Sequence, residues 1–207
     1  MTSPSDTVSL LPSPERRLAA RVGGLLFRKR SWLPVPFVIL TLLLPTRGSA
    51  AGWIIGGLVV AIGEAIRLAG VAAAGTVTRR RSRNVQRLVT YGVFAWVRNP
   101  LYVGNFLIWM GFVAISGAVV FLPFAVMLFA LEYWLIVAYE EAVLETIFGA
   151  EYLEYRARTP RWLPCLPRGA ATGPHDWAEA WRSEISTFWQ YAALIAAFSL
   201  KQNFLAR

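Results

Sequence analysis

Residues 88–111 read LVTYGVFAWVRNPLYVGNFLIWMG, and they place two polar residues, Arg98 and Asn99, at the start of a long apolar run. The run continues without a charged residue from Leu101 to Leu131. A helix needs about 20 apolar residues to cross the ~30 Å hydrocarbon layer of a membrane. The run is therefore too long for one crossing, and its polar start needs a structural or functional reason.

The apolar run carries its own interruption. Ser116 and Gly117 break it, and Pro123 suits the first turn of a returning helix. These signals predict a tight helical hairpin, in which residues 101–115 run out and residues 119–139 run back.

Two adjacent carboxylates, Glu140 and Glu141, close the expected hairpin. Because a hairpin returns to the face at which it began, we expect this pair to lie near Arg98 and Asn99. Adjacent residues of a helix point about 100° apart, so one carboxylate can face a pocket while the other faces solvent. A carboxylate in this place can hold an ammonium group of a ligand; the alternative is an acidic helix end without a ligand.

Asn99 and Pro100 carry the pattern of a helix start, with asparagine as the cap and proline at the first helical position. Backbone N–H groups at such a start bind anionic groups readily. Arg98 adds a positive charge and a fork for a carboxylate or phosphate. The alternative is a capped helix with an arginine that extends to the membrane surface.

The composition indicates an integral membrane protein. Of the 207 residues, 56% are hydrophobic and 16% are charged, whereas soluble domains are about 25% charged. Further uncharged runs occupy residues 31–46, 48–63 and 185–200. We therefore expect an all-α, integral membrane helical bundle with four to five transmembrane helices; the alternative, a soluble helical bundle, has little use for such runs.

The net charge of +9 is distributed at the ends of the apolar runs. That distribution indicates attraction to anionic lipid on the cytoplasmic side and argues against nucleic acid as a partner. The clearest case is TRRRSRNVQR at residues 78–87, which we interpret as a cytoplasmic segment. The single Cys165 excludes an intrachain disulfide, and the sequence has no Cys/His cluster that predicts a metal site.

We expect a disordered tail at residues 1–14 and one membrane domain at residues 15–207. Within the domain, the expected elements are a basic surface helix, a first span, a second span and a C-terminal helix that either spans or lies in the interface, at residues 15–30, 31–45, 50–74 and 175–201. Asp176 and Glu179 resemble a helix-capping box at the start of the last helix.

Two charged residues of the expected second span, Glu64 and Arg67, are spaced to pair on one helix face. The pair either neutralises itself between helices or forms the polar wall of a buried pocket. Gly52 and Gly56 have the spacing that allows close helix packing.

Taken together, these motifs resemble the membrane methyltransferases of the isoprenylcysteine carboxyl methyltransferase and phospholipid N-methyltransferase type. The pattern of that family is LVT-x-G-x-Y, then R-H-P-x-Y-x-G, a helical hairpin, and E-E-x-x-L-x-x-x-F-G-x-x-Y-x-x-Y with a proline end. In this chain the pattern runs through residues 88–94, 98–104 and 140–155 and ends at Pro160. The match covers about residues 55–165, with order and spacing intact.

The resemblance implies that S-adenosylmethionine binds at the cytoplasmic face, in a fold without a Rossmann domain. By motif position it implies cofactor-binding roles for Gln86, Arg87, Leu88, Val89, Phe94, Asn99, Pro100, Leu101, Tyr102, Gly104, Glu140 and Glu141. Glu140 would take the amino group of the cofactor, and Arg98, Asn99 and Glu140 are the expected catalytic residues. The expected methyl acceptor is a membrane lipid or a lipid-like or small apolar molecule, in a bacterial or archaeal cytoplasmic membrane, and no metal is expected.

The chain departs from the family pattern at three positions. Asn99 replaces the family histidine, and because asparagine does not titrate near neutral pH we expect no general base there. Phe94 replaces a tyrosine. Ile136 stands where isoprenylcysteine enzymes carry a substrate-binding arginine, which argues against a prenylcysteine substrate but not against methyl transfer.

Two alternatives to a methyltransferase stay open. Sterol-type reductases, which use NADPH, share a related R-H-P-N-Y-x-G-E pattern, although this chain has Leu101 for the asparagine and Asn105 for the glutamate. A catalytically degenerate membrane scaffold is the other alternative, and it rests on the Asn99 and Phe94 changes.

Overall fold

The computed structural model describes residues 14–29, 32, 34–75, 87–167 and 172–205, and these residues form helices and connecting segments without a strand. The helices are α2 (Pro14–Lys29), α3 (Pro34–Leu43), α4 (Ala50–Ala74), η2 (Gly92–Ala95), α5 (Pro100–Ser116), η3 (Val119–Phe121), α6 (Leu122–Phe148), α7 (Ala150–Arg158) and α8 (Trp177–Leu205). The predicted all-α class is confirmed for this part of the chain. The expected tail, apart from Pro14, and the basic segment, apart from Arg87, lie outside the described residues.

The predicted hairpin is confirmed in α5 and α6. Gly117 ends α5 in the left-handed conformation, with φ 75°, and Pro123 lies in the first turn of α6. A side chain at Gly117 would also meet the backbone of Arg47 and Gly48. This turn therefore requires glycine for two reasons, its left-handed backbone and the lack of space for a side chain. The predicted end of the returning helix is wrong, because α6 continues to Phe148 and the two carboxylates lie within it.

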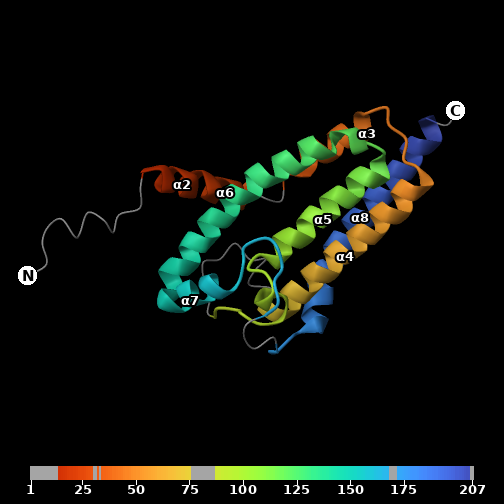
Figure 1. Cartoon of the computed structure of the whole chain (residues 1–207). Helices are drawn as coiled ribbons and strands as arrows, with labels where there is room; N and C mark the ends of the chain where they lie inside the picture. The colour runs from red at the N-terminus through yellow and green to blue at the C-terminus, as the bar shows by residue number, and fades with distance from the viewer. Residues whose placement is uncertain (1–13, 30–31, 33, 76–86, 168–171, 206–207) are drawn as a thin grey trace, which may run out of the picture.

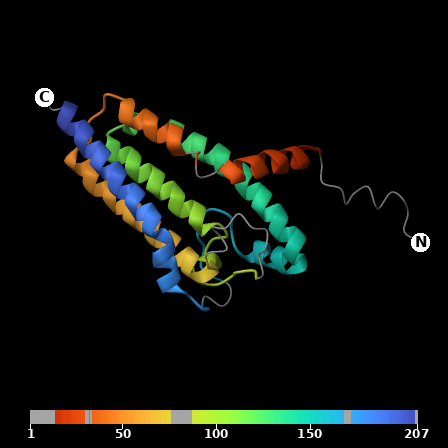
Figure 2. The ribbon, with the colours of Figure 1, turned by 180° about the vertical axis from the view of Figure 1, so that it is seen from behind.

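Helices α4, α5 and α8 lie side by side and form the main bundle (Figures 1 and 2). The contact of α4 with α5 depends on small residues, as the spacing of Gly52 and Gly56 predicts. A Cβ atom at Gly56 would stand 2.5 Å from the carbonyl oxygen of Gly111, and one at Gly63 would stand 2.7 Å from that of Gly104. The two backbones are therefore too close for larger residues at these positions.

Two helical segments, Ala50–Ala74 and Val119–Phe148, are long and apolar enough to cross a membrane, whereas α3 and α5 are shorter apolar helices. At 1.5 Å per residue α3 reaches only about 15 Å, so the described helix is shorter than the span that we expected at residues 31–45. Helix α3 begins at Pro34 and ends at Leu43. Pro45 restricts the backbone of the preceding residue, Leu44, to extended conformations, so the helix cannot continue. Large apolar side chains on the outer face of α4, at Ile54, Leu58 and Ile62, are more than half exposed, as lipid contact requires.

Several elements that are distant in sequence come together at the end opposite the α5–α6 turn (Figures 1 and 2). There the end of α4, η2, the start of α5, α7 and the start of α8 meet. Helix α6 diverges from α5 toward this end, and α2 packs across it, with Gly23 and Gly24 against Tyr139. The divergence leaves the far end of α6 to be joined to α5 by polar contacts.

Candidate cofactor site at the polar end of the hairpin

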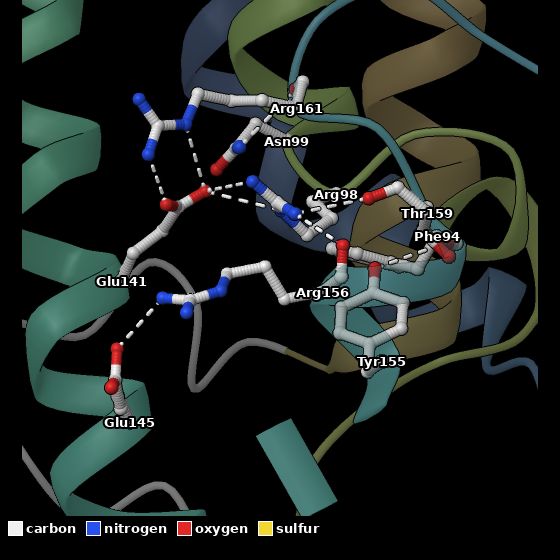
Figure 3. A network of polar contacts seen from close by, with 9 residues as sticks. All are labelled: Phe94, Arg98, Asn99, Glu141, Glu145, Tyr155, Arg156, Thr159 and Arg161. Atoms are coloured by element: carbon white, nitrogen blue, oxygen red, sulfur yellow. Dashed lines mark hydrogen bonds and ion pairs between the residues drawn. The ribbon is translucent and has the colours of Figure 1, made fainter. Parts of the chain in front are cut away.

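An ion pair between Arg98 and Glu141 joins the two polar motifs, as the hairpin predicted (Figure 3). The Nη2 atom of Arg98 lies 3.0 Å from Oε1 of Glu141, and Nε donates to the same oxygen at 3.2 Å. Both side chains are at least nine-tenths buried. A buried pair of this kind fixes the distance between the start of α5 and the last third of α6.

Arg161 is the third member of this cluster. Its Nε donates to Oε1 of Glu141 at 3.1 Å, and its Nη2 donates to Oε2 (Figure 3). The guanidinium also lies over the ring of Trp134, 5.2 Å from the centroid. Two arginines thus share one carboxylate, and the cluster keeps an excess of one positive charge.

The remaining donors of Arg98 are directed at the last turn of α7 and at the loop that follows it. Its Nη1 donates to the carbonyl oxygens of Arg156, at 2.8 Å, and Thr159, at 3.1 Å. Its backbone N–H donates to the carbonyl of Pro160 at 2.9 Å. Arg98 therefore holds Glu141 and this loop in place, and its predicted contact with an anionic ligand stays a prediction.

The start of α5 has the predicted residues in their predicted positions, with Asn99 at the N-cap and Pro100 at the first helical position. The predicted capping bond is wrong, because the Asn99 side chain makes no capping hydrogen bond. Its amide is turned away and donates to the carbonyl of Arg161 at 3.3 Å. Pro100 has no N–H, and the N–H groups of Tyr102 and Val103 donate to the carbonyl of Asn99, so the N–H of Leu101 is the donor at this helix start that a capping side chain would have satisfied and that an anionic group can use.

Two tyrosines of α7 extend the site and differ in their partners. The hydroxyl of Tyr155 donates to the carbonyl of Phe94 at 2.8 Å, which ties α7 to η2 (Figure 3). The hydroxyl of Tyr152 is buried and has no hydrogen-bond partner among the described residues. Burial raises the pKa of both phenols, and the nearby Glu141 raises that of Tyr152 further. Both hydroxyls therefore stay protonated and able to donate at neutral pH.

Seven other predicted site residues fall into two groups. Leu88, Val89 and Phe94 are half-buried in the segment that leads to α5, and Glu140 is half-buried on α6 beside the buried Glu141. Three further residues lie where α5 packs against other helices. Leu101 contacts Gly70 of α4, Tyr102 contacts Tyr133 of α6, and Gly104 contacts Arg67 of α4.

Of the remaining two predicted residues, the structure describes Arg87 alone. Arg87 is exposed and donates to the hydroxyl of Tyr91 at 2.7 Å. Gln86 lies outside the described residues.

Sequence reasoning missed two members of this site. Arg161 lies between Pro160 and Pro164, and no local pattern pairs it with a glutamate 20 residues away. Tyr152 is one of the two tyrosines of the quoted motif but received no role. The Y-x-x-Y spacing of the motif was the signal in the sequence that could have indicated a role for Tyr152.

The residues present fit a cofactor that carries a carboxylate. An uncapped start of α5, an excess positive charge around Glu141 and the unpartnered Tyr152 hydroxyl all favour an anionic group at this end of the bundle. A carboxylate can accept hydrogen bonds from each of these kinds of donor.

The part of the chain that carries both polar motifs is similar to known methyltransferases. The family model described as phospholipid methyltransferase matches residues 51–151. The chain is 35% identical over 119 residues to a protein-S-isoprenylcysteine O-methyltransferase of Homo sapiens, an alignment that covers 54% of this chain and 40% of that protein. It is 32% identical over 115 residues to the protein of the same name from Schizosaccharomyces pombe, which covers 51% and 47%.

A probable protein-S-isoprenylcysteine O-methyltransferase of Oryza sativa subsp. indica is 35% identical over 121 residues, 54% of this chain and 61% of that protein. The chain spans about half the length of the curated relatives it matches. No solved structure matches the chain significantly. The matched region contains α4, the α5–α6 hairpin and both polar motifs, and this part of the chain is therefore similar to the phospholipid methyltransferases and to the isoprenylcysteine O-methyltransferases.

Proposed function

We propose that the chain is a membrane methyltransferase that uses S-adenosylmethionine to methylate a lipid-like or small apolar acceptor. Its similarity to known methyltransferases supports methyl transfer, and the observation that carries the proposal is the buried contact of Arg98 with Glu141 and Arg161. That contact assembles the two family motifs at one end of the hairpin. Because basic segments collect on the cytoplasmic side, we place this end at the cytoplasmic face.

The residues of the chain have distinct roles in this proposal. The start of α5 and the hydroxyl of Tyr152 hold the carboxylate of the cofactor, and Glu140 holds its ammonium group. Leu88, Val89 and Phe94 line its apolar part. When bound, S-adenosylmethionine supplies a methyl group activated by a positively charged sulfur.

Arg98 and Arg161 act through Glu141, because they fix α6 relative to α5 and so set the distance between the two ends of the cofactor site. Catalysis then rests on orientation and on exclusion of water, and such positioning supplies up to about 7–11 kcal/mol of a barrier. Asn99 donates to a backbone carbonyl and accepts no proton in this proposal.

The proposed acceptor is lipid-like but not specifically a prenylated cysteine. Ile136, at the position where the family resemblance places a substrate-binding arginine, is fully buried in the apolar core with Phe129 and Trp109. This position offers neither charge nor access to an acceptor carboxylate. An apolar acceptor that enters from the membrane needs no such partner.

Titration calorimetry of the detergent-purified chain with S-adenosylhomocysteine tests the proposal. We expect binding to the wild-type protein, and about tenfold weaker binding to Glu140→Gln, since a hydrogen-bonded charge is lost. Glu145→Gln is the matched control, because this carboxylate lies farther along α6 in an exposed pair with Arg156, and binding should be unchanged. Folded wild-type protein that does not bind the ligand would overturn the proposal, and binding of NADPH instead would point to a reductase.

Transfer itself is tested in membranes that contain the chain. Incubation with S-adenosylmethionine labelled in its methyl group should move label into an organic-soluble product. Label that stays in the aqueous phase contradicts a lipid-like acceptor while leaving cofactor binding intact.

A further inference from the structure

A hollow of about 600 Å³ opens at the polar end of the bundle, between the end of α4 and the start of α8. Its floor is formed by residues 72–75 of α4, and its sides are formed by Arg87 and residues 174–178. The alanines of the floor are small, and the sides carry charged and aromatic groups. The hollow therefore suits a compact ligand with both apolar and polar edges.

His175, the single histidine of the chain, holds one side of this hollow in place. Its Nδ1 lies 2.7 Å from the carbonyl oxygen of Gly173, and its ring meets Tyr91 edge-on with centroids 5.7 Å apart. Its Nε2 lies against Gly92, where a Cβ atom would stand only 2.7 Å away. Gly92 also has φ 61°, so glycine serves both the backbone turn and the seat for the histidine.

The next two residues supply recognition chemistry. Trp177 is 50% exposed, and its ring stacks with that of His175 at an interplanar angle of 9°. Asp176 caps α8, because its Oδ1 accepts the N–H of Glu179 at 2.8 Å. A carboxylate has more acceptor positions than one bond uses, so Asp176 can accept further donors.

The hollow adjoins the proposed cofactor site. Arg87, on one of its sides, is the described end of the segment that precedes the LVTYG motif, and it bonds to Tyr91 of that motif. Gly70 of α4 lies next to Leu101 at the start of α5. Gly70 precedes residues 72–75, the part of α4 that lines the hollow, by less than one helical turn. The hollow and the start of α5 therefore lie against neighbouring residues of α4.

We propose that this hollow is a nucleoside-binding subsite, in which the base lies against Trp177 and the ribose hydroxyls donate to Asp176. A flat aromatic base suits the exposed indole ring, and a carboxylate is the usual partner of a ribose diol. The subsite rests on the proposed function, because the adenosine part of the cofactor is the nucleoside that it would receive. It adds the loop before α8 to a site that the family motifs alone place on α5 and α6.

A pair of tryptophans gives the decisive test. Trp181 lies one turn along α8, is 55% exposed, and does not line the hollow, so Trp181→Ala is a matched control for Trp177→Ala. We expect Trp177→Ala to bind S-adenosylhomocysteine about tenfold more weakly than the wild type in titration calorimetry, since one base–aromatic stack is lost. We expect Trp181→Ala to bind as the wild type does.

Free adenosine separates this inference from the proposed function. It should compete with S-adenosylhomocysteine for the wild-type protein, and Trp177→Ala should reduce that competition. If S-adenosylhomocysteine binds but adenosine does not compete, or if both tryptophan variants bind equally well, the subsite is wrong and the proposed function survives. If S-adenosylhomocysteine does not bind the wild type, the proposed function itself fails.

Asp176→Asn tests the second contact without removing the cap, because asparagine caps helices as well as aspartate does. The wild type should bind adenosine more tightly than 2′,3′-dideoxyadenosine, and the variant should lose most of that preference. An unchanged preference, measured on a variant with wild-type thermal stability, excludes Asp176 as the ribose partner.

Discussion

Two buried clusters of three charges differ in their balance and in their place. The inner cluster lies within the bundle and has two carboxylates for one arginine; its members are Glu64, Arg67 and Glu184. The end cluster lies at the polar end of the hairpin and has two arginines for one carboxylate; its members are Arg98, Glu141 and Arg161. The first carries an excess negative charge and the second an excess positive charge.

The inner cluster joins three helices. Nε of Arg67 lies 3.3 Å from Glu64 on the same helix, and Nη2 lies 3.0 Å from Glu184 of α8. Nη1 donates to the side-chain oxygen of Asn105 on α5, and Tyr191 of α8 donates to Glu64 at 2.8 Å. Of the two interpretations of the Glu64–Arg67 spacing, the structure shows a pair between helices, because its donors are directed at α5 and α8.

The end cluster is less enclosed. The Arg161 side chain keeps 28% of its surface exposed, whereas Glu184 of the inner cluster keeps none. The comparison shows that similar residue types serve two purposes. The inner cluster is enclosed by helices and holds the bundle together. The end cluster lies at an open end and has an excess positive charge, which suits an anionic ligand.

The largest effect should come from Arg67→Met. This change leaves two carboxylates buried without their common partner, and breaking a buried pair typically costs about 3–5 kcal/mol. We expect thermal unfolding of the detergent-purified variant to show at least that loss of stability, with no folded fraction as the extreme result.

A triple variant serves as the control for Arg67→Met. Glu64→Gln, Arg67→Met and Glu184→Gln together remove every formal charge of the inner cluster, so most of the stability should return. A triple variant that is as unstable as Arg67→Met would show that the arginine acts by packing and not by charge.

Glu141→Gln should have a smaller effect, of about 2–3 kcal/mol, because one of the two arginines it releases can turn toward water. It should also weaken S-adenosylhomocysteine binding, since α6 is no longer held against the start of α5. Glu145→Gln is the control, and as half of an exposed pair it should cost less than about 1 kcal/mol. Equal losses in the two variants would mean that the end cluster is no more important than a surface pair.

The sequence predicted those parts of the fold and site that depend on local signals. Ser116, Gly117 and Pro123 define the hairpin turn, and a hairpin returns to its starting face whatever surrounds it. For that reason Arg98 and a glutamate of the carboxylate pair could be placed together from sequence alone. The position of Pro100 at the first turn of α5 is local in the same sense.

The rest depends on contacts between distant segments. Glu184 pairs with Arg67 although 117 residues separate them, and the local sequence pattern of neither helix predicts this contact. Which of Glu140 and Glu141 points inward depends on the rotation of α6, and α6 packs against α2, α5 and α7, which are distant from one another in sequence. The Asn99 amide was expected to cap α5, but it bonds to a carbonyl of a loop that sequence alone did not position.

Tyr155→Phe tests whether the end cluster depends on the α7 contact. The change removes the bond to the carbonyl of Phe94 and leaves that carbonyl without its donor, so we expect a loss of about 1–2 kcal/mol. Thermal unfolding measures the loss. A variant as stable as the wild type would mean that η2 is held by its other contacts alone.

Tyr152→Phe should have the smallest effect on stability, and its sign is informative. The hydroxyl is buried without a partner among the described residues, so its removal costs no hydrogen bond and relieves a desolvated group. We expect unfolding at the wild-type temperature or slightly above it, together with weaker S-adenosylhomocysteine binding if this hydroxyl donates to the cofactor. Tyr155→Phe is the matched control, because it removes the same atom from a partnered tyrosine on the same helix. A loss of stability in Tyr152→Phe as large as that in Tyr155→Phe would mean that the Tyr152 hydroxyl already has a hydrogen-bond partner. That hydroxyl would then not be available to donate to a ligand.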